Sequence, residues 1–240
     1  MKTRGSGILG YNAQAAVDTK HHLIVSHEVN NNGSDRSQLS HVAKQAKEAI
    51  GAEELMVVAD RGYYKAEEIL ACEEAGITTY LPKVQTFNNL SKGFFDKRDF
   101  IYHVKNDEYI CPAGQALKRR TQYHARDQVF YRYWFSDYQS CAIKSQCTSG
   151  KERRVTRWEH EATLDRLQAR QDDEPEMMRI RRSTVEHPFG TIKMWMGATH
   201  FQMKTLNRVN GEMSLQVLAY NLKRVINIMG TLSLIKAIQA

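Results

Sequence analysis

The apolar and polar positions of the first fifty residues predict a β-hairpin followed by a helix. Residues 8–18 and 22–29 alternate well enough to form two strands joined by a short turn. A polar cluster rich in asparagine then ends the second strand. Either Ser34 or Asp35 can cap the helix that follows, because apolar residues keep helical spacing from there to about Ile50.

A strand, a helix and another strand are predicted next. Residues 55–58 are all apolar, which indicates a strand buried on both faces, as in a sheet covered by helices. A helix at about 65–74 and a short strand at 77–81 follow. Ligands of open α/β sheets bind beyond the carboxyl ends of strands, where Asp60 lies. The alternative for Asp60 is that it only caps the turn after the strand.

Residues 85–173 have a different texture, which indicates a partly β insertion. Aromatic and β-branched runs predict three strands, at residues 100–103, 108–111 and 129–135. Basic clusters occur at 118–120 and 151–154. We expect Trp134 and Trp158 to belong to a core rather than to stack on bases.

The last part of the chain is predicted to be helical. Residues 213–229 have the spacing of an amphipathic helix. Its expected core side consists of Leu215, Val217, Leu218, Leu222, Val225 and Ile226. We therefore divide the chain into the first part of a core (1–84), an insertion (85–173) and C-terminal helices (174–240).

The segment 179–193 carries the most distinctive charge pattern. If it is helical, Arg179, Arg182, Glu186 and Lys193 lie on one face, with three cations around one carboxylate. Such an acid among bases suits a metal ion held beside phosphates. A solvated basic helix face is the simpler alternative.

Two features of this segment favour other structures. Ser183 and Glu186 have the spacing of a capping box, with Ser183 as the N-cap of a helix and Glu186 reaching back to it. Pro188 removes a hydrogen bond inside a helix and kinks it. The position of Lys193 relative to Glu186 therefore depends on how the kink is accommodated.

Composition indicates a class of partner only through charge. The chain has 240 residues, enough for one large domain or one domain with an insertion, and 42% apolar residues can support a core. A net charge of +7 and a pI near 9.2 favour a polyanion such as nucleic acid. The excess of positive charge is strongest at 177–230, where the only acids are Glu186 and Glu212. The basic residues of this range are Arg179, Arg181, Arg182, Lys193, Lys204, Arg208, Lys223 and Arg224.

The sequence contains no run long enough to span a membrane and no apolar signal region, so we expect a cytoplasmic protein without a membrane partner. Four cysteines are too few for a disulfide scaffold. Cys111, Cys141 and Cys147 lack a convincing Cys-x2-Cys pair for zinc. A zinc site would need a fourth ligand from His103, His124 or His160.

Residues 58–63 (VADRGY) and 182–193 (RSTVEHPFGTIK) together resemble bacterial insertion-sequence transposases of the DDE type. Residues 10–18 (GYNAQAAVD) and 218–224 (LAYNLKR) are also similar to that group, so the likeness spans nearly the whole chain. Each motif alone is weak, whereas their order and spacing are specific.

The resemblance implies an RNase H-like α/β fold: a mixed sheet flanked by helices, with an insertion before the last catalytic helix. It implies that Asp60 and Glu186 are catalytic and ligate two divalent ions, Mg²⁺ or Mn²⁺, during DNA strand cleavage and transfer. Arg182 and Lys193 match positions that hold DNA phosphates, and Arg179 lies beside them. The implied partners are the transposon ends and target DNA, with a possible homodimer or higher assembly on DNA at the bacterial nucleoid.

Three positions depart from the family pattern. Arg179 stands where the family signature has a tyrosine, and Tyr138 stands where a fourth cysteine would pair with Cys141. The family's first catalytic aspartate lies on a strand before residues 10–18, and only nine residues, none acidic, precede that strand. We therefore expect an N-terminally truncated transposase, in which Asp18 is either a substitute ligand or a turn residue.

Two other functions compete with transposition. One is a catalytically deficient remnant that only binds DNA or a full-length partner. The other is a metal-dependent nuclease of the same fold that cleaves without joining.

Overall fold

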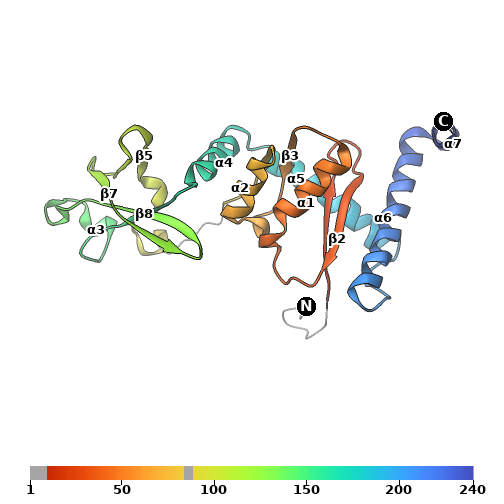
Figure 1. Cartoon of the computed structure of the whole chain (residues 1–240), viewed down its shortest axis with the longest axis horizontal. Coiled ribbons are helices and arrows are strands. Elements are labelled where there is room, and N and C mark those ends of the chain that lie inside the picture. Colours follow the sequence, from red (N-terminus) through yellow and green to blue (C-terminus); the bar gives the residue numbers. More distant parts are fainter. Residues whose placement is uncertain (1–9, 84–88, 240) are drawn as a thin grey trace. The chain divides into compact units, whose positions relative to one another are not determined.

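The structure is a computed structural model that describes residues 10–83 and 89–239 (Figure 1). The chain divides into two compact units. Unit 1 comprises residues 1–83 and 166–240, and unit 2 comprises residues 84–165. Residues 8 and 9 of the first predicted strand lie outside the described residues.

The predicted hairpin and helix form the beginning of unit 1. Strands β1 (Asn12–Val17) and β2 (Ile24–Asn30) pair antiparallel, and helix α1 (Leu39–Ile50) follows. A 3-10 turn, Asp35–Ser37, precedes α1, and the Ser34 hydroxyl accepts a hydrogen bond from its backbone. Ser34 therefore caps this turn, while α1 itself begins one residue after Gln38 without a side-chain cap.

The second predicted group is also confirmed. Strands β3 (Leu55–Val58) and β4 (Ile77–Tyr80) pair parallel, and helix α2 (Ala66–Glu74) connects them. The prediction that β3 is buried on both faces is wrong. Three of its residues are half-buried and Met56 is 54% exposed, because β3 borders a cavity on the side away from β4.

The C-terminal part of unit 1 is helical. Helix α4 (Glu161–Asp173) leads into unit 1, and α5 (Met177–Gly190) runs directly into a π-helical turn, Thr191–Trp195. Helices α6 (Leu206–Met229) and α7 (Thr231–Gln239) complete the chain. None of the helices in residues 10–83 and 89–239 has both the length and the apolarity needed to cross a membrane.

The buried face of α6 differs from the prediction. Val209, Met213, Val217 and Tyr220 pack against β2 and the π-helical turn. These residues repeat every three or four positions and so define one face. The prediction is correct for Val217, which is buried, whereas Val225 and Ile226 are half-buried. It is wrong for three leucines, which lie on the face opposite the core: Leu215 is 64% exposed, Leu218 63% and Leu222 48%.

The mixed α/β class is confirmed, and the strands of unit 1 form two pairs. Among the described residues, β1 bonds only to β2 and β3 only to β4. Helix α1 packs on β1 and β2, and α5 contacts both β1 and β3. In Figure 1, α1 lies in front of these strands and α5 behind them. The two pairs therefore share helical layers without sharing a hydrogen-bonded ladder.

Unit 2 is built on a five-stranded antiparallel sheet in chain order. Its strands are β5 (Ile101–His103), β6 (Glu108–Ile110), β7 (Ala116–Ala125), β8 (Gln128–Trp134) and β9 (Val155–Trp158). The sequence predicted β5, β6 and β8 but not β7 or β9. Strand β7 escaped prediction because most of its residues are polar and exposed.

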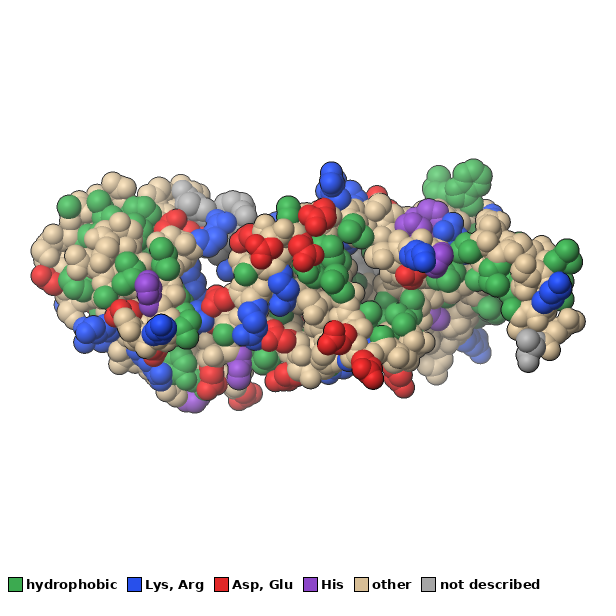
Figure 2. Space-filling model, turned by 90° about the horizontal axis from the view of Figure 1, so that it is seen from above, with side chains coloured by type: hydrophobic (Ala, Val, Ile, Leu, Met, Phe, Trp, Pro, Cys, Tyr) green, Lys and Arg blue, Asp and Glu red, His purple; other side chains and the backbone are tan. Residues whose placement is uncertain are grey.

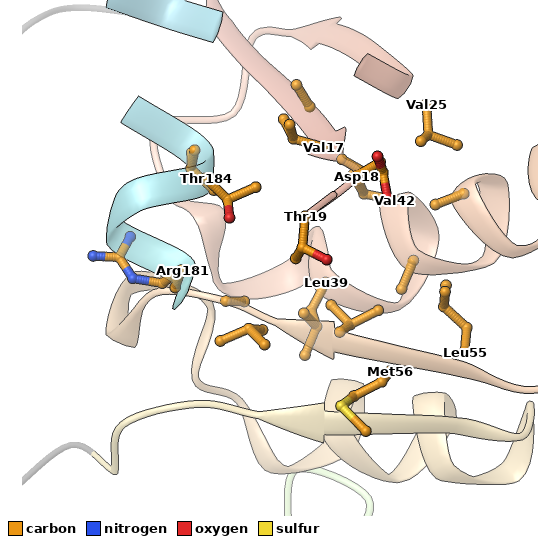
Figure 3. Close-up of a pocket in the computed structure, with 18 of the residues that line it drawn as sticks. Val17, Asp18, Thr19, Val25, Leu39, Val42, Leu55, Met56, Arg181 and Thr184 are labelled. Atoms are coloured by element: carbon orange, nitrogen blue, oxygen red, sulfur yellow. The ribbon is translucent and has the colours of Figure 1, made fainter. Parts of the chain in front are cut away.

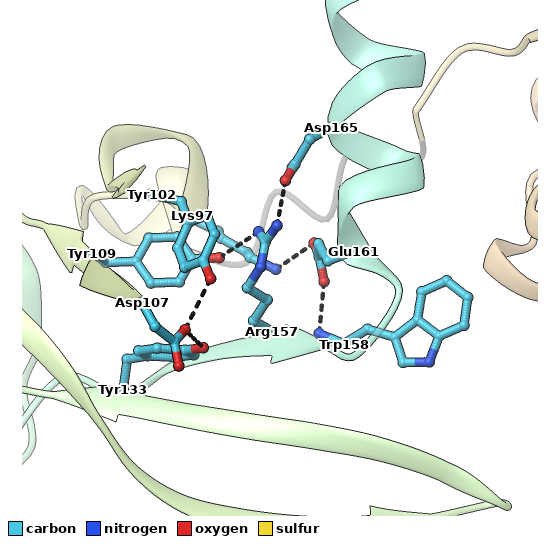
Figure 4. Close-up of polar contacts among 9 residues, drawn as sticks. All are labelled: Lys97, Tyr102, Asp107, Tyr109, Tyr133, Arg157, Trp158, Glu161 and Asp165. Atoms are coloured by element: carbon cyan, nitrogen blue, oxygen red, sulfur yellow. Dashed lines mark hydrogen bonds and ion pairs between the residues drawn. The ribbon is translucent and has the colours of Figure 1, made fainter. Parts of the chain in front are cut away.

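Buried tyrosines and their polar partners hold the core of unit 2 (Figure 4). The Asp107 carboxylate accepts hydrogen bonds from the hydroxyls of Tyr102 (2.8 Å) and Tyr133 (2.5 Å). Burial alone would raise the pKa of Asp107, but these bonds and the nearby Arg119 lower it. Burial and the Asp107 charge raise the pKa of Tyr133. Asp107 is therefore a charged acceptor in the native unit.

A second group of contacts joins β9 to the start of α4. The Arg157 guanidinium donates to Asp165 (2.6 Å) and to the Tyr109 hydroxyl (3.2 Å). The Glu161 carboxylate accepts from Lys97 Nζ (2.5 Å) and from the backbone N–H of Trp158 (2.9 Å). Trp158 is buried, as predicted.

Candidate functional site

Asp60 lies at the carboxyl end of β3, where the sequence places a site residue. Its carboxylate accepts a hydrogen bond from the Arg61 backbone N–H at 2.7 Å and caps a 3-10 turn, Arg61–Tyr63. The side chain is otherwise exposed. Asp60 therefore caps the turn, as the simpler interpretation predicts, and still presents a carboxylate oxygen to solvent.

Tyr63 connects the turn after Asp60 to the first strand. Its hydroxyl donates to the Gln14 side-chain oxygen, and the Gln14 amide donates to Asp35 at 2.8 Å. Asn12 donates to the same Asp35 oxygen at 2.6 Å. Burial, followed by the charges of Asp35 and Asp60, raises the pKa of Tyr63 to about 12. Sequence reasoning considered Asp35 only as a cap and missed this network.

An apolar cavity of about 260 Å³ lies beside Asp60. Its walls come from β1, β3, α1 and α5, and Figure 3 shows Leu39 and Val42 of α1 and Thr184 of α5 around it. Arg181 and Val185 of α5 also line it. Asp60 thus shares one cavity with the helix that carries Glu186.

Asp18 lines the same cavity at the opposite end from Asp60. Tyr63, just after β3, reaches Gln14 in the first half of β1, so β1 and β3 run in opposite directions. Asp18 follows the last residue of β1, and its carboxylate accepts from the His21 backbone N–H at 2.6 Å. The geometry favours the turn role for Asp18 over that of a substitute ligand.

The basic segment begins as a regular helix, and the capping-box interpretation is wrong. Ser183 lies inside α5, where its hydroxyl donates back to the Ile180 carbonyl at 2.9 Å. Thr184 does the same at 2.8 Å. Short side chains inside a helix commonly bond to the preceding turn in this way. Ser183 and Glu186 therefore lie in neighbouring turns inside one helix, and neither is at its start.

The faces of α5 separate apolar from charged residues. Thr184 and Pro188 are buried, whereas Arg179, Arg182 and Glu186 are all exposed. The predicted alignment of these three charged residues follows from their place in one continuous helix. In the described part of the chain, none of them takes part in an ion pair within 4.0 Å.

Pro188 does not end α5, but the chain changes helical type soon after it. The π-helical turn Thr191–Trp195 carries Lys193, which is exposed. A π-turn has more residues per turn than an α-helix. Lys193 therefore follows a different rotation from the α-helical one that the sequence pattern assumes.

Contacts with α6 fix the end of α5. His187 Nδ1 lies 3.0 Å from the Tyr220 hydroxyl, and its ring stacks on His22 with centroids 4.9 Å apart. Burial, then the charges of Arg224 and His22, lower the pKa of His187. The Arg224 guanidinium donates twice to the His21 carbonyl, at 2.6 and 3.0 Å. Arg224 therefore has a structural role in a region predicted to bind phosphates.

Asp60 and one face of α5 line the same cavity, whereas Glu186 lies on the exposed face of that helix. Among the residues it describes, no three His, Cys, Asp or Glu side chains are gathered closely enough to hold a metal ion. The chemistry of the two carboxylates still fits Mg²⁺, which is usually bound by one or two carboxylates together with water and substrate phosphates.

The cysteines of unit 2 also come together. Cys111, Cys141 and Cys147 line one small cavity with Tyr138. Burial raises the pKa of Cys147, and the Tyr138 hydroxyl donates to the Arg153 carbonyl at 3.0 Å. Among the described residues, these thiols are nevertheless not gathered closely enough to hold a metal ion.

Unit 1 is thus a mixed α/β unit that carries one carboxylate at the end of a strand and another, on α5, among basic side chains. The chain matches the family described as transposase DDE domain over residues 1–222. It therefore belongs to the DDE transposases, and its function is that of a DNA transposase domain. Members of this family act on DNA and generally depend on divalent metal ions. Searches of curated proteins and of solved structures found no match.

Proposed function

We propose that Asp60 and Glu186 are catalytic carboxylates for DNA strand cleavage and transfer. The observation that carries the proposal is the packing of α5, which bears Glu186, against β1 and β3, next to the cavity that Asp60 lines. An acid on a strand end and an acid on an adjacent helix can approach one phosphodiester from two sides.

Asp60 and Glu186 would hold Mg²⁺ or Mn²⁺, with two ions in a complete site. Oxygen ligands suit these hard cations better than zinc. Bound there, the ions would polarise the phosphate and activate the attacking hydroxyl. The network of Tyr63, Gln14 and Asp35 holds the turn that positions Asp60. Because Glu186 has no ion-pair partner among the described residues, its carboxylate is available as a ligand.

Arg179, Arg182 and Lys193 would hold DNA phosphates beside Glu186. All three are exposed. Arginine can bind a phosphate with two parallel hydrogen bonds, whereas lysine acts as a point charge. Affinity for DNA should therefore fall steeply as salt rises, because released counterions dominate such binding.

A cleavage and strand-transfer assay tests the two carboxylates. The substrate is a labelled duplex carrying the element's terminal sequence, with Mg²⁺ or Mn²⁺, and the variants are Asp60→Asn and Glu186→Gln. Glu54→Gln, an exposed acid before β3, and Glu176→Gln, the N-cap residue of α5, are matched controls. We expect products from the wild type and both controls and none from the two site variants.

Three results would contradict the proposal. Full activity of either site variant would remove that residue from catalysis. Salt-sensitive binding without products, under conditions where the protein is folded, would instead describe a protein that only binds DNA. Cleavage without joining would indicate a nuclease.

We also propose that α6 mediates a homodimer on DNA at the bacterial nucleoid. Leu215, Leu218, Leu222, Val225 and Met229 recur with alternating spacings of three and four residues. This is the seam of a two-helix coiled coil. Leucines at three of these positions are about half exposed or more, and Figure 2 shows hydrophobic side chains on the surface of the region with α6 and α7. A second copy of α6 would cover them.

A further inference from the structure

The two longest strands of unit 2, β7 and β8, form a hairpin that extends past the other strands of the sheet (Figure 1). Strand β6 pairs with β7 only as far as Lys118, and β9 pairs with β8 only from Phe130 onward. Among the described residues, the segment between Arg119 and Val129 is therefore bordered by no third strand. We call this segment, together with the rest of β7 and β8, the ribbon.

Contacts between its own side chains stiffen the ribbon. Tyr123 and Phe130 stack across the two strands with ring centroids 5.4 Å apart. The Arg132 guanidinium lies 4.1 Å from the centre of the Tyr123 ring. A bare two-stranded hairpin is marginally stable in water, whereas aromatic and cation–π pairs across the strands stabilise it. The ribbon is thus a preformed element.

The opposite face of the ribbon carries a row of exposed polar side chains on β7: Arg119, Gln122 and His124. Each stands opposite an odd-numbered residue of β8, and alternate residues of a strand point to the same face. Polar contacts join the row. Arg119 Nη2 lies 3.4 Å from Gln122 Oε1, and Gln122 Nε2 lies 3.5 Å from His124 Nε2.

The side chains of this row are of the types that read base edges. Arginine pairs with O6 and N7 of guanine, and glutamine with N6 and N7 of adenine. A histidine ring nitrogen can donate to the same acceptors. The row therefore offers donors and acceptors to a base edge, which a surface of charge alone would not.

Positive charge surrounds the row. Asp127 is the only acid in residues 116–134, a range whose cations are Lys118, Arg119, Arg120, Arg126 and Arg132. In residues 10–83 and 89–239, Arg119 is the only one of these cations in an ion pair within 4.0 Å, with Asp107 at 3.5 Å. The remaining charges are not neutralised by carboxylates and suit a polyanion.

The tip of the ribbon is narrow and also basic. Arg126 and Asp127 have φ angles of 50° and 60°, as a two-residue turn of type I′ requires. Asparagine and glycine are the usual residues in such a turn. An arginine held there stores backbone strain, which gathers at ligand-binding sites.

The dimensions of the ribbon fit the major groove of duplex DNA. That groove is about 12 Å wide and admits a two-stranded ribbon. Side chains on one face of a strand recur about every 6.6–6.8 Å, which is close to two base steps of about 3.4 Å. The major groove of an RNA helix is too narrow for side chains to read. An acidic peptide or an anionic membrane surface would make no use of the amide and imidazole groups.

We propose that the ribbon enters the major groove of duplex DNA, where Gln122 and His124 read base edges and Arg126 binds a flanking phosphate. This role rests on the proposed function only in that DNA is the ligand. It gives unit 2 the reading of sequence, whereas the phosphate contacts proposed for Arg179, Arg182 and Lys193 belong to unit 1.

Selection from a pool of short DNA duplexes with a randomised centre tests this role on the full chain, without divalent ions. We expect the wild type to enrich one sequence. Gln122→Ala and His124→Ala should each lose the preference at one or two adjacent base pairs and bind the enriched duplex about tenfold more weakly. Their unchanged affinity for an unenriched duplex would show that they are folded. Thr121→Ala, an exposed position on the other face of β7, should keep the full preference.

Two further measurements separate base reading from charge. Arg126→Asn suits the turn but removes the charge, so it should weaken binding to both duplexes alike and reduce the salt slope by about 1. Replacing purines of the enriched site by 7-deaza analogues removes N7 from the major groove only. The wild type should lose affinity for that duplex, and Gln122→Ala should lose no more at the base pair that Gln122 reads.

Several outcomes would overturn this role for the ribbon. They are the absence of an enriched sequence, an unaltered preference in both row variants, indifference to 7-deaza purines, and equal affinity for single strands or duplex RNA. Because none of these readouts needs cleavage, Asp60→Asn and Glu186→Gln should leave them unchanged. An unaltered preference in the row variants, with cleavage still lost in the two carboxylate variants, would refute the role of the ribbon alone.

Discussion

Replacement of Asp107 should destabilise unit 2 selectively. The Asp107 carboxylate accepts from two tyrosine hydroxyls, and Tyr133 is 0% exposed. Loss of a buried partner costs about 1–3 kcal/mol for each orphaned group. Tyr102 is only half-buried and should contribute less. The two hydroxyls together place the cost of removing the acceptor at about 2–4 kcal/mol.

Backbone geometry separates two substitutions at this position. Asp107 has a φ of 48°, in the left-handed region, which asparagine tolerates and alanine does not. Asp107→Ala should therefore lose the acceptor and also add about 1–2 kcal/mol of backbone strain to the folded state. The free energy of unfolding should fall by about 3–6 kcal/mol in total. Asp107→Asn keeps the backbone and one acceptor oxygen, so it should cost about 1–2 kcal/mol.

Urea unfolding followed by tryptophan fluorescence measures these differences. Trp134 and Trp158 are in unit 2, and the remaining tryptophan, Trp195, is 82% exposed in unit 1. A Trp195→Phe background restricts the signal to unit 2. Equal effects of the two Asp107 substitutions, or losses below about 0.5 kcal/mol, would refute the role given to the tyrosine network.

Three further predictions concern unit 1. Burial lowers the pKa of His27 below 6.5. Below pH 6.5 the unfolded chain therefore binds a proton at His27 more readily than the folded chain does, and stability falls. His27→Gln should reduce the drop in melting temperature between about pH 7.5 and 5.5. Leu218→Lys should shift sedimentation toward monomer, whereas Asn227→Lys, off the apolar seam, should not. Arg224→Met removes two hydrogen bonds to the turn between β1 and β2. It should lower the free energy of unfolding, measured by chemical denaturation, by about 1.5–3 kcal/mol, whereas Lys223→Met should change it little.

The sequence predicted the elements of unit 1 well because their apolar spacing is regular. Strands β1 to β4 and helices α1 and α2 all follow it closely. The charged face of α5 was also predictable, since Arg179, Arg182 and Glu186 needed only a continuous helix. The π-turn at Lys193 was not, because helical type after a proline depends on packing against α6.

Other features depend on contacts that a single sequence does not display. Apolar residues cover two faces of α6, so periodicity alone could not decide which face meets β2. Strand β7 is exposed and polar, and its pairing comes from β8 beside it. The link from Tyr63 to Gln14 and Asp35 joins residues far apart in sequence. Such tertiary contacts define the surroundings of Asp60.

Binding of Mn²⁺ in the presence of DNA tests most directly whether Asp60 and Glu186 act at one site. Paramagnetic resonance of Mn²⁺ would compare the wild type with Asp60→Asn, Glu186→Gln and the double variant. We expect each single change to weaken binding at least about tenfold, as altering even an outer partner of a metal site does, and the double variant to be little worse than either. Unchanged affinity in either single variant would contradict a shared site.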